Sequence, residues 1–404
     1  MNQEKESRPG LSGQVEDHVE RHRGLRIHML AEGDAESWDS WSGISKSLVT
    51  HLRQRGHEVI VSDVDLYGLE RFWVALGELA ANRKRWWVKY HLNARPFLHR
   101  SRRAAQAVSK VGGEVDLILQ IGATFKVPVS EYTPVFLYCD GNIALSEIAT
   151  IGGQSEAVFL ADREKSAIMR RESEIYNNST HIFTLSDRLR RSFIADFGIS
   201  QGRVSTVYAG SNLPRQPLDD VNCASGPPSI LFVGRDFERK GGEVLLSAFR
   251  RVKEALPEAE LRIVGPQGIA DQEGVRSYGL LDKRVEAERR KLEELFRTSD
   301  VFCLPTRYEG FSISFLEAMS FGLPCVSTFS EWSPPEMIED GETGLVVALD
   351  DPGALSSALL RLLQDRDLRR RMGAAGHRRV NSLFTWDAVV DRMESSIREY
   401  LTND

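Results

Sequence analysis

Residues 309–317 read Glu309-Gly310-Phe311-Ser312-Ile313-Ser314-Phe315-Leu316-Glu317 and lie between an apolar run and a helical pattern. The run before them, residues 300–305, is typical of a short buried strand, and residues 318–322 continue a helical pattern to a glycine stop. The predicted arrangement is therefore strand, loop and helix. Glu309 falls in the loop, and Glu317 falls in the helix about two turns later at 3.6 residues per turn.

This arrangement predicts a ligand as well as a fold. Free backbone N–H groups at a helix N-terminus bind phosphate or sugar hydroxyls. A carboxylate on each side of them, Glu309 and Glu317, suits a ligand that is anionic in the middle and hydroxylated at both ends. A nucleotide-sugar has this pattern.

Outward from this segment, strand-like and helical runs alternate along the chain, which is typical of mostly parallel sheets covered by helices. A stretch rich in proline and turn formers, 213–228, indicates a linker between two α/β domains, 24–212 and 229–384. Residues 385–404 read as one amphipathic helix after the second sheet. Two such domains leave a cleft at the carboxyl ends of their strands.

Composition narrows the class of protein. The chain has 404 residues with 41% hydrophobic and 27% charged residues, typical of a globular protein. The net charge of −6 argues against broad nucleic-acid binding. No Cys-x-x-Cys pair occurs among the four cysteines, and no run approaches the ~20 apolar residues of a membrane span. Residues 1–23 are polar, so we expect a flexible tail, no signal peptide and a cytoplasmic protein.

The second domain opens with a strand that ends at Gly234 and a loop that carries Arg235 and Lys240 ahead of a helix. Two cations beside a helix N-terminus suit a diphosphate, whose charge lies in the middle of the ligand. A solvated basic loop is the simpler interpretation, and the Glu309–Glu317 pair favours the diphosphate site.

Together these segments resemble the retaining glycosyltransferases of family 4, also called glycosyl transferases group 1, which have the GT-B fold. The resemblance is carried by Val233-Gly234-Arg235 with Lys240-Gly241, Leu261-Arg262-Ile263-Val264-Gly265, the segment from Glu309 to Pro324, and Glu336-Met337-Ile338 with residues 340–346. It implies two Rossmann-like domains facing across a cleft, with the C-terminal helix crossing back to the first domain.

The resemblance also implies roles for single residues. Arg235 and Lys240 would hold the donor diphosphate, Glu309 would contact the transferred sugar, and Glu317 would bind the ribose hydroxyls. Residues on the loop and helix start would bind sugar hydroxyls and the distal phosphate: Gly310, Phe311, Ser312, Ile313 and Ser314. Gly43 would approach the phosphates from the first domain. Tyr278 and Leu280 would line the base pocket.

The acceptor side is less specific in sequence. Asp140 ends a predicted strand, residues 134–139, and either polarises the acceptor hydroxyl or stabilises the cationic sugar, or is an ordinary turn residue. Asp63-Val64-Asp65 resembles a metal-binding Asp-x-Asp of another glycosyltransferase fold, but carboxylates at strand ends are common in turns. We therefore expect no metal and no cofactor. We expect His57, at the start of a strand, to have a structural role and not a catalytic one.

One stretch is strongly basic. From residue 79 to 113 there is no Asp or Glu, and nine cations lie between Arg83 and Lys110, with Trp86 and Trp87 among them. Basic residues with Trp suit an anionic membrane surface or an anionic acceptor. A solvated helix pair with aromatic core contacts is the alternative.

The sequence therefore predicts a metal-independent, retaining glycosyltransferase that uses a UDP- or GDP-linked sugar. The acceptor would be a sugar, a lipid-linked glycan or a small molecule, and residues 83–110 would give peripheral contact with the inner membrane face. Two alternatives stay open: a nucleotide-sugar epimerase or phosphorylase of the same fold, and a non-catalytic glycan-binding or partner subunit.

Overall fold

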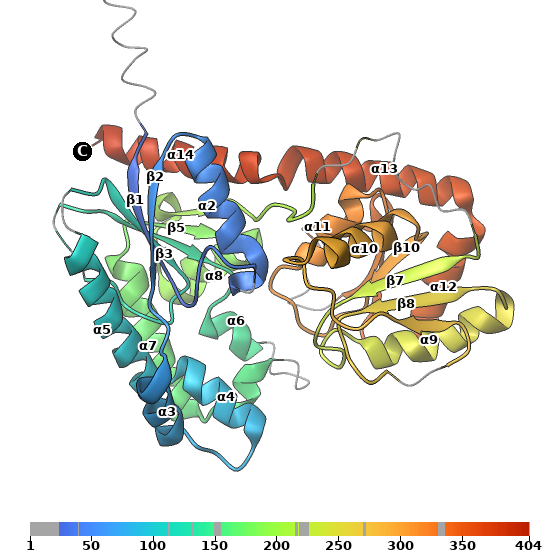
Figure 1. Ribbon diagram of the computed structural model, residues 1–404, viewed down its shortest axis with the longest axis horizontal. Helices are drawn as coiled ribbons and strands as arrows, with labels where there is room; N and C mark the ends of the chain where they lie inside the picture. Colours follow the sequence, from blue (N-terminus) through green and yellow to red (C-terminus); the bar gives the residue numbers. More distant parts are fainter. Residues whose placement is uncertain are drawn as a thin grey trace, which may run out of the picture.

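The computed structural model describes residues 24–38, 40–111, 114–128, 130, 132–148, 155–214, 217, 226–269, 272–329 and 336–403. The predicted tail, 1–23, and much of the predicted linker lie outside these residues. Two α/β domains stand side by side, the first running from blue to green and the second from yellow to orange (Figure 1).

The first domain is built on a parallel sheet with the strand order β2-β1-β3-β4-β5-β6. Its strands are β1 (Arg26–Ala31), β2 (Glu58–Asp63), β3 (Leu117–Ile121), β4 (Val135–Cys139), β5 (His181–Thr184) and β6 (Val204–Thr206). Every residue of β3 and β4 is buried, as expected for central parallel strands covered on both faces.

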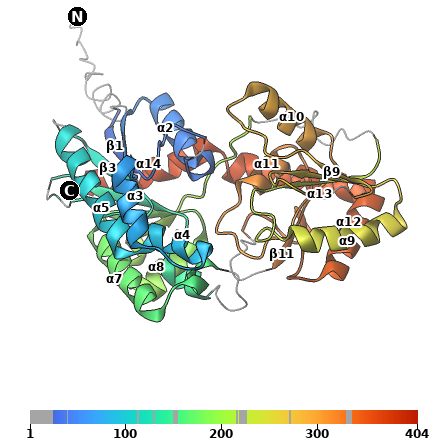
Figure 2. The same cartoon turned by 60° about the horizontal axis from the view of Figure 1, so that its bottom comes forward.

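Helices cover this sheet. They are η1 (Ser40–Gly43), α2 (Ile44–Gln54), α3 (Gly68–Gly77), α4 (Arg83–Leu92), α5 (Ala94–Val111), α6 (Ile143–Ile148), η2 (Glu156–Phe159), α7 (Asp162–Asn178), α8 (Asp187–Phe197) and η3 (Gln201–Arg203). Figure 2 shows α3, α4 and α5 lying together on the first domain.

The second sheet is also parallel, with the order β12-β11-β10-β7-β8-β9. Its strands are β7 (Ser229–Val233), β8 (Glu260–Val264), β9 (Val275–Ser277), β10 (Val301–Leu304), β11 (Cys325–Phe329) and β12 (Gly344–Ala348). Its helices are α9 (Gly242–Ala255), α10 (Glu286–Arg297), α11 (Ile313–Ser320), α12 (Pro352–Gln364) and α13 (Arg366–Leu383). The architecture is the two-domain α/β fold that the sequence predicts.

The last helix, α14 (Trp386–Asn403), leaves the second domain and packs on the first. Together α13 and α14 run along one side of both domains (Figure 1). His57 explains part of this docking, because its Nδ1 accepts the Leu25 amide at 3.0 Å while its Nε2 lies 2.9 Å from Glu394. His57 is therefore structural, as predicted.

None of the helices among the described residues has the length and apolar content needed to span a bilayer.

Candidate active site

A cavity of about 810 Å³ lies between the two domains. Its walls come from segments that follow β1, β3 and β4 in the first domain, and β7, β8 and β10 in the second. In each sheet the strand order reverses at one point, between β1 and β3 and between β7 and β10. Open α/β sheets bind ligands at such switch points, and here the two switch points face one cavity.

The loop after β7 places Gly234, Arg235 and Lys240 in the cavity wall. Gly241 follows with φ +74°, and a Cβ there would clash with the Pro305 carbonyl, so the loop can turn tightly only with glycine at this position. Lys240 Nζ lies 3.0 Å from the Oε2 of Glu309. The sequence prediction that Lys240 and Glu309 share one site agrees with this contact.

Glu309 also pairs with Arg239, whose guanidinium lies 3.3 Å from the same carboxylate oxygen. Sequence reasoning named Arg235 and Lys240 but assigned no role to Arg239. Its guanidinium also donates to the Tyr308 carbonyl at 2.6 Å, so it ties the loop after β7 to the loop after β10. Arg239 is a positioning residue for Glu309.

The N-terminus of α11 forms the next part of the wall, with Gly310, Phe311, Ser312, Ile313 and Ser314 all lining the cavity. Ser312 is 2% exposed, and its Oγ makes no hydrogen bond to a described protein atom. A buried hydroxyl beside free amides at a helix start suits a polar ligand group, because such an oxygen is costly to leave unpaired.

Glu317 lies two turns further along α11 and is almost fully buried. It pairs with Lys283, which reaches the cavity from the segment after β9. Sequence reasoning missed Lys283, because nothing local connects residues 34 positions apart. Leu280 also lines the cavity, whereas Tyr278 lies outside it and packs its ring near Lys291 Nζ.

On the opposite side Asp140 follows β4 and faces the cavity. Part of its surface is open to the cavity, but protein on both sides of the cleft displaces most of the surrounding water. This loss of hydration raises the pKa of Asp140 to about 6, and the like charge of Glu309 contributes. The two carboxylates are thus close enough across the cleft to influence each other.

Two further carboxylates of the first domain were not predicted. Glu32, just after β1, accepts from Thr124 at 2.6 Å and lies 2.9 Å from the fully buried Arg100. Burial alone would raise the pKa of Glu32, but the hydrogen bond with His91 and the charge of Arg100 hold it below its ordinary value. Glu32 and His91 both line the cavity. A polar residue directly after a strand was the signal that could have found Glu32.

Glu172, on α7, lines the cavity beside Arg171. Desolvation raises the pKa of Glu172 to about 7, although the Ile143 amide donates to it at 3.0 Å. Arg170, Arg171 and Glu174 lie next to it on α7, so one more charged residue there does not stand out in the sequence.

Some predicted residues lie beside the site or away from it. Gly43 is buried with φ +81° at the start of α2, and its neighbours Ser42 and Ile44 line the cavity in its place. Asp63 accepts the Gly33 amide at 2.9 Å and the Asp65 amide at 2.8 Å, as a turn residue does. The described residues contain no group of three or more His, Cys, Asp or Glu placed to hold a metal.

The fold and the site define the class of protein: two Rossmann-like domains with a ligand cavity between them, the GT-B architecture of glycosyltransferases. Residues 219–379 match the family described as Glycosyl transferases group 1.

Most of the curated proteins similar to this chain in sequence are glycosyltransferases by name. D-inositol 3-phosphate glycosyltransferase of Corynebacterium diphtheriae is 34% identical over 58% of this chain and 60% of its own length. Glycogen synthase of Mycobacterium tuberculosis is 27% identical over 54% of each chain. Spore coat protein SA of Bacillus subtilis is 26% identical over 56% of this chain and 67% of its own. The matches thus span little more than half of the chain and about 54 to 67% of these relatives.

Solved structures match over nearly the whole chain. Sucrose-phosphate synthase of Thermosynechococcus elongatus superposes with a TM-score of 0.67 at 18% identity, covering 94% of this chain and all of that one. The Anabaena HepE protein in complex with UDP and glucose gives a TM-score of 0.58 at 15% identity, with 93% and 99% covered. At these identities the matches show the fold alone.

Proposed function

We propose that this protein is a retaining, metal-independent glycosyltransferase that moves a sugar from a nucleoside-diphosphate sugar to an acceptor hydroxyl. One observation carries the proposal. A single cavity brings the cations of the β7 loop, the N-terminus of α11 and the carboxylates of Glu309 and Glu317 opposite Asp140 of the first domain. The names of the relatives support a sugar-transfer activity.

The diphosphate binds between the β7 loop and the start of α11. Lys240 and Arg235 supply positive charge, and the amides of residues 310–314 donate hydrogen bonds with the helix dipole behind them. Because Glu309 and Arg239 hold this loop in place before the donor arrives, little reorganisation is needed as charge develops on the leaving diphosphate.

The nucleoside extends along α11. One oxygen of Glu317 pairs with Lys283, which leaves acceptor capacity on the carboxylate for the ribose hydroxyls. Leu280 and Leu281 supply an apolar wall for the base. The donor is a UDP- or GDP-linked sugar that acts as a substrate, with no separate cofactor, and the UDP bound in the Anabaena complex is consistent with a uridine donor.

The transferred sugar then lies between Glu309 and Asp140. The bond from its anomeric carbon to the diphosphate breaks, a bond to the acceptor oxygen forms, and the acceptor hydroxyl loses its proton. An ionised Asp140 accepts that proton; alternatively an oxygen of the leaving diphosphate accepts it, and Asp140 stabilises the cationic sugar. The acceptor enters over the first domain, where Glu32, His91 and Glu172 line the cavity.

The test is a calorimetric panel of the common nucleotide-sugars against the wild-type protein and Glu317→Gln. We expect one donor to bind the wild type and to bind at least about tenfold more weakly to the variant, which loses a charged acceptor of ribose hydrogen bonds. NMR of the products separates the remaining classes. A transferred sugar with retained anomeric configuration supports the proposal, an epimerised sugar or sugar phosphate replaces it with another enzyme class, and absence of donor binding supports a non-catalytic subunit.

A further inference from the structure

Helix α3 turns an apolar stripe away from the protein. Leu69 is 77% exposed, Phe72 57%, Trp73 56% and Leu76 42%, and this spacing puts all four on one face of the helix. Val74 is the one residue of α3 that is fully buried. A helix whose apolar side chains face outward needs a partner for that face, since contiguous exposed apolar patches mark interaction sites.

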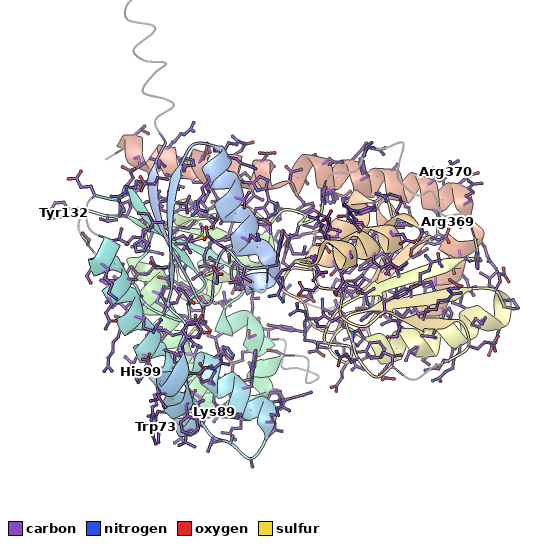
Figure 3. The ribbon with its side chains drawn as sticks, viewed as in Figure 1. Trp73, Lys89, His99, Tyr132, Arg369 and Arg370 are labelled. Carbon is purple, nitrogen blue, oxygen red and sulfur yellow. The ribbon has the colours of Figure 1, made fainter. Side chains whose placement is uncertain are left out.

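The stripe lies at the outer end of the first domain. Figures 1 and 2 both show α3 and α4 next to each other, Figure 1 shows them at the end of the domain opposite α14, and Figure 3 shows Trp73 near that end. Three further exposed apolar side chains lie on or beside the neighbouring helices: Leu79, Trp87 and Leu98. Exposed apolar side chains therefore occur on α4 and α5 as well as on α3.

Only part of the predicted basic stretch reaches this surface. Arg100 is fully buried, where it pairs with Glu32, and Lys89, Arg103, Lys84 and Arg85 each pair with a carboxylate of the fold. Trp86 is half-buried and donates from Nε1 to the Ala75 carbonyl at 2.7 Å, so it joins α4 to α3 and is not a surface anchor. The expectation that residues 83–110 act as one basic, Trp-containing contact surface is corrected accordingly: Arg100 and Trp86 are held within the fold, and four further cations are ion-paired.

Exposed cations without a carboxylate partner in the described part of the chain lie on the same three helices as these apolar side chains. Arg71 on α3, Arg83 at the start of α4, and Arg95 and Arg102 on α5 are exposed, and no carboxylate of the described residues pairs with any of them. The Arg95 guanidinium packs directly over Gly77, at the end of α3. Glu70, the one acid on α3, is paired with His99 and Arg103. The rim of the patch is thus positive.

From this combination we propose that α3 is an interfacial helix that docks the protein on an anionic lipid bilayer. Phe, Trp and Leu on one face, with long flexible cations around them, suit insertion at the headgroup level of a membrane that carries negative charge. The positive rim selects this occupant over a neutral membrane or a second copy of the chain, whose own rim would repel it.

Docking of α3 would also determine where the acceptor enters the cavity, an inference that rests on the proposed function. Trp87 and His91 on α4 line the cavity, and their rings lie 4.3 Å apart. Since α4 adjoins α3, a docked α3 would hold the acceptor side of the cavity close to the bilayer surface. The acceptor would then be an amphiphile that presents its hydroxyl group from the membrane.

The experiment is co-sedimentation of the purified full chain with vesicles of phosphatidylcholine, with and without phosphatidylglycerol, at low and high salt. We expect binding to the anionic vesicles, weakened by salt. The double substitution Phe72→Ser/Trp73→Ser should weaken vesicle binding on the order of tenfold or more, because it removes two aromatic side chains that insert into the bilayer. Arg83→Glu/Arg95→Glu should weaken it and reduce its salt dependence.

Matched controls lie elsewhere on the surface. Tyr132 is 89% exposed on the same domain, far from Trp73 in Figure 3, so Tyr132→Ser should bind as the wild type does. Arg370→Glu, on α13 of the second domain, is the charge control. Thermal unfolding checks that all variants fold, and donor binding by calorimetry should be unchanged in them, so vesicle binding and the proposed function can fail separately.

Negligible binding of the wild type to anionic vesicles at low salt would overturn the proposal. Equal binding of the Phe72/Trp73 variant and the Tyr132 control would also overturn it. The proposal is also overturned if light scattering after size exclusion shows a dimeric wild type and a monomeric double variant, and neither binds vesicles. The stripe would then be a protein interface.

Discussion

Three carboxylates in the cavity are each held by a fixed cation. Glu309 pairs with Lys240, Glu317 with Lys283, and Glu32 with Arg100. A buried charge is tolerated when it is paired, and removal of one partner leaves the other uncompensated. The chemistry of the cavity therefore depends on pairs of residues more than on single side chains.

Lys240→Ala is expected to lower kcat on the order of 10²-fold or more, as removal of one preorganised electrostatic group does. The variant loses both the phosphate cation and the 3.0 Å partner of Glu309. Steady-state turnover with the donor found by calorimetry measures the effect, and Arg235→Ala should behave similarly. Arg370→Ala, which removes an exposed cation of α13, is the control. Near-normal turnover in a folded Lys240→Ala protein contradicts the assignment.

The raised pKa of Asp140 predicts that kcat/KM depends on pH. Its pKa of about 6 means that the carboxylate forms as the pH rises through that value, so kcat/KM should rise with an acid limb near pH 6. Asp140→Asn should abolish the limb. Glu309→Gln removes a negative charge that opposes ionisation, so in its residual activity the limb should move to lower pH.

Glu172, with a pKa of about 7, is the competing titrating group, and the control is Glu172→Gln. An unchanged limb in Asp140→Asn, together with a shifted one in Glu172→Gln, would assign the titration to Glu172.

At the scale of elements, α14 connects the two domains. It carries Glu394 to His57 and Asp391 to Arg55, and Arg392 donates to the Val207 carbonyl at 2.8 Å. The edge of Tyr400 meets Phe136 in the centre of the first sheet. These contacts join residues far apart in the sequence, so α14 attaches the C-terminal end of the chain to the first domain.

Trp386→Ala should destabilise the protein by about 3–5 kcal/mol, the usual cost of truncating a buried aromatic side chain to Ala. Trp386 is 4% exposed, packs against Gly210, and donates from Nε1 to Asn212 at 3.2 Å. Denaturant unfolding measures the loss. Leu401→Ala, at the exposed end of the same helix, should change stability by no more than about 0.5 kcal/mol. Equal effects of the two substitutions would show that Trp386 does not anchor the helix.

At the scale of the whole molecule, the cavity exists only because the two domains are held face to face. Glu336 of the second domain accepts from the amides of Asp187 and Arg188 at 2.7 and 2.9 Å, and so caps the start of α8 in the first. Lys84 reaches Glu238 at 3.2 Å, but both side chains are exposed, and such pairs contribute little. The Glu336 cap is the stronger connection between the domains near the cleft.

Turnover is expected to survive EDTA. Lys240, Arg235 and the start of α11 supply the positive charge that a metal would otherwise bring to a diphosphate. The measurement compares initial rates of protein treated with EDTA and of untreated protein. Loss of activity that Mn²⁺ or Mg²⁺ restores would contradict the prediction and assign part of the phosphate binding to a metal.

The two α/β domains, the β-α alternation and the strand, loop and helix around residues 309–317 could all be predicted from the amino-acid sequence. These features depend on apolar periodicity and on glycine or proline at element ends, which are local. The strands predicted at residues 134–139 and 300–305 are β4 and β10, whose ends lie within one residue of those bounds. The three residues of β9, at a sheet edge, carry almost no periodic signal, so such a strand is not predictable in this way.

Which side chains meet in the cavity could not be predicted from the sequence. Lys283 at Glu317, Arg100 at Glu32 and the position of Tyr278 outside the cavity follow from packing between segments far apart in the chain. The outward orientation of the apolar face of α3 is likewise not predictable from the local sequence. The spacing of Leu69, Phe72, Trp73 and Leu76 is that of an ordinary core-facing stripe, and only the packing of the domain shows that it faces solvent. Local sequence sets which face of a helix is apolar, whereas long-range contacts set where that face points.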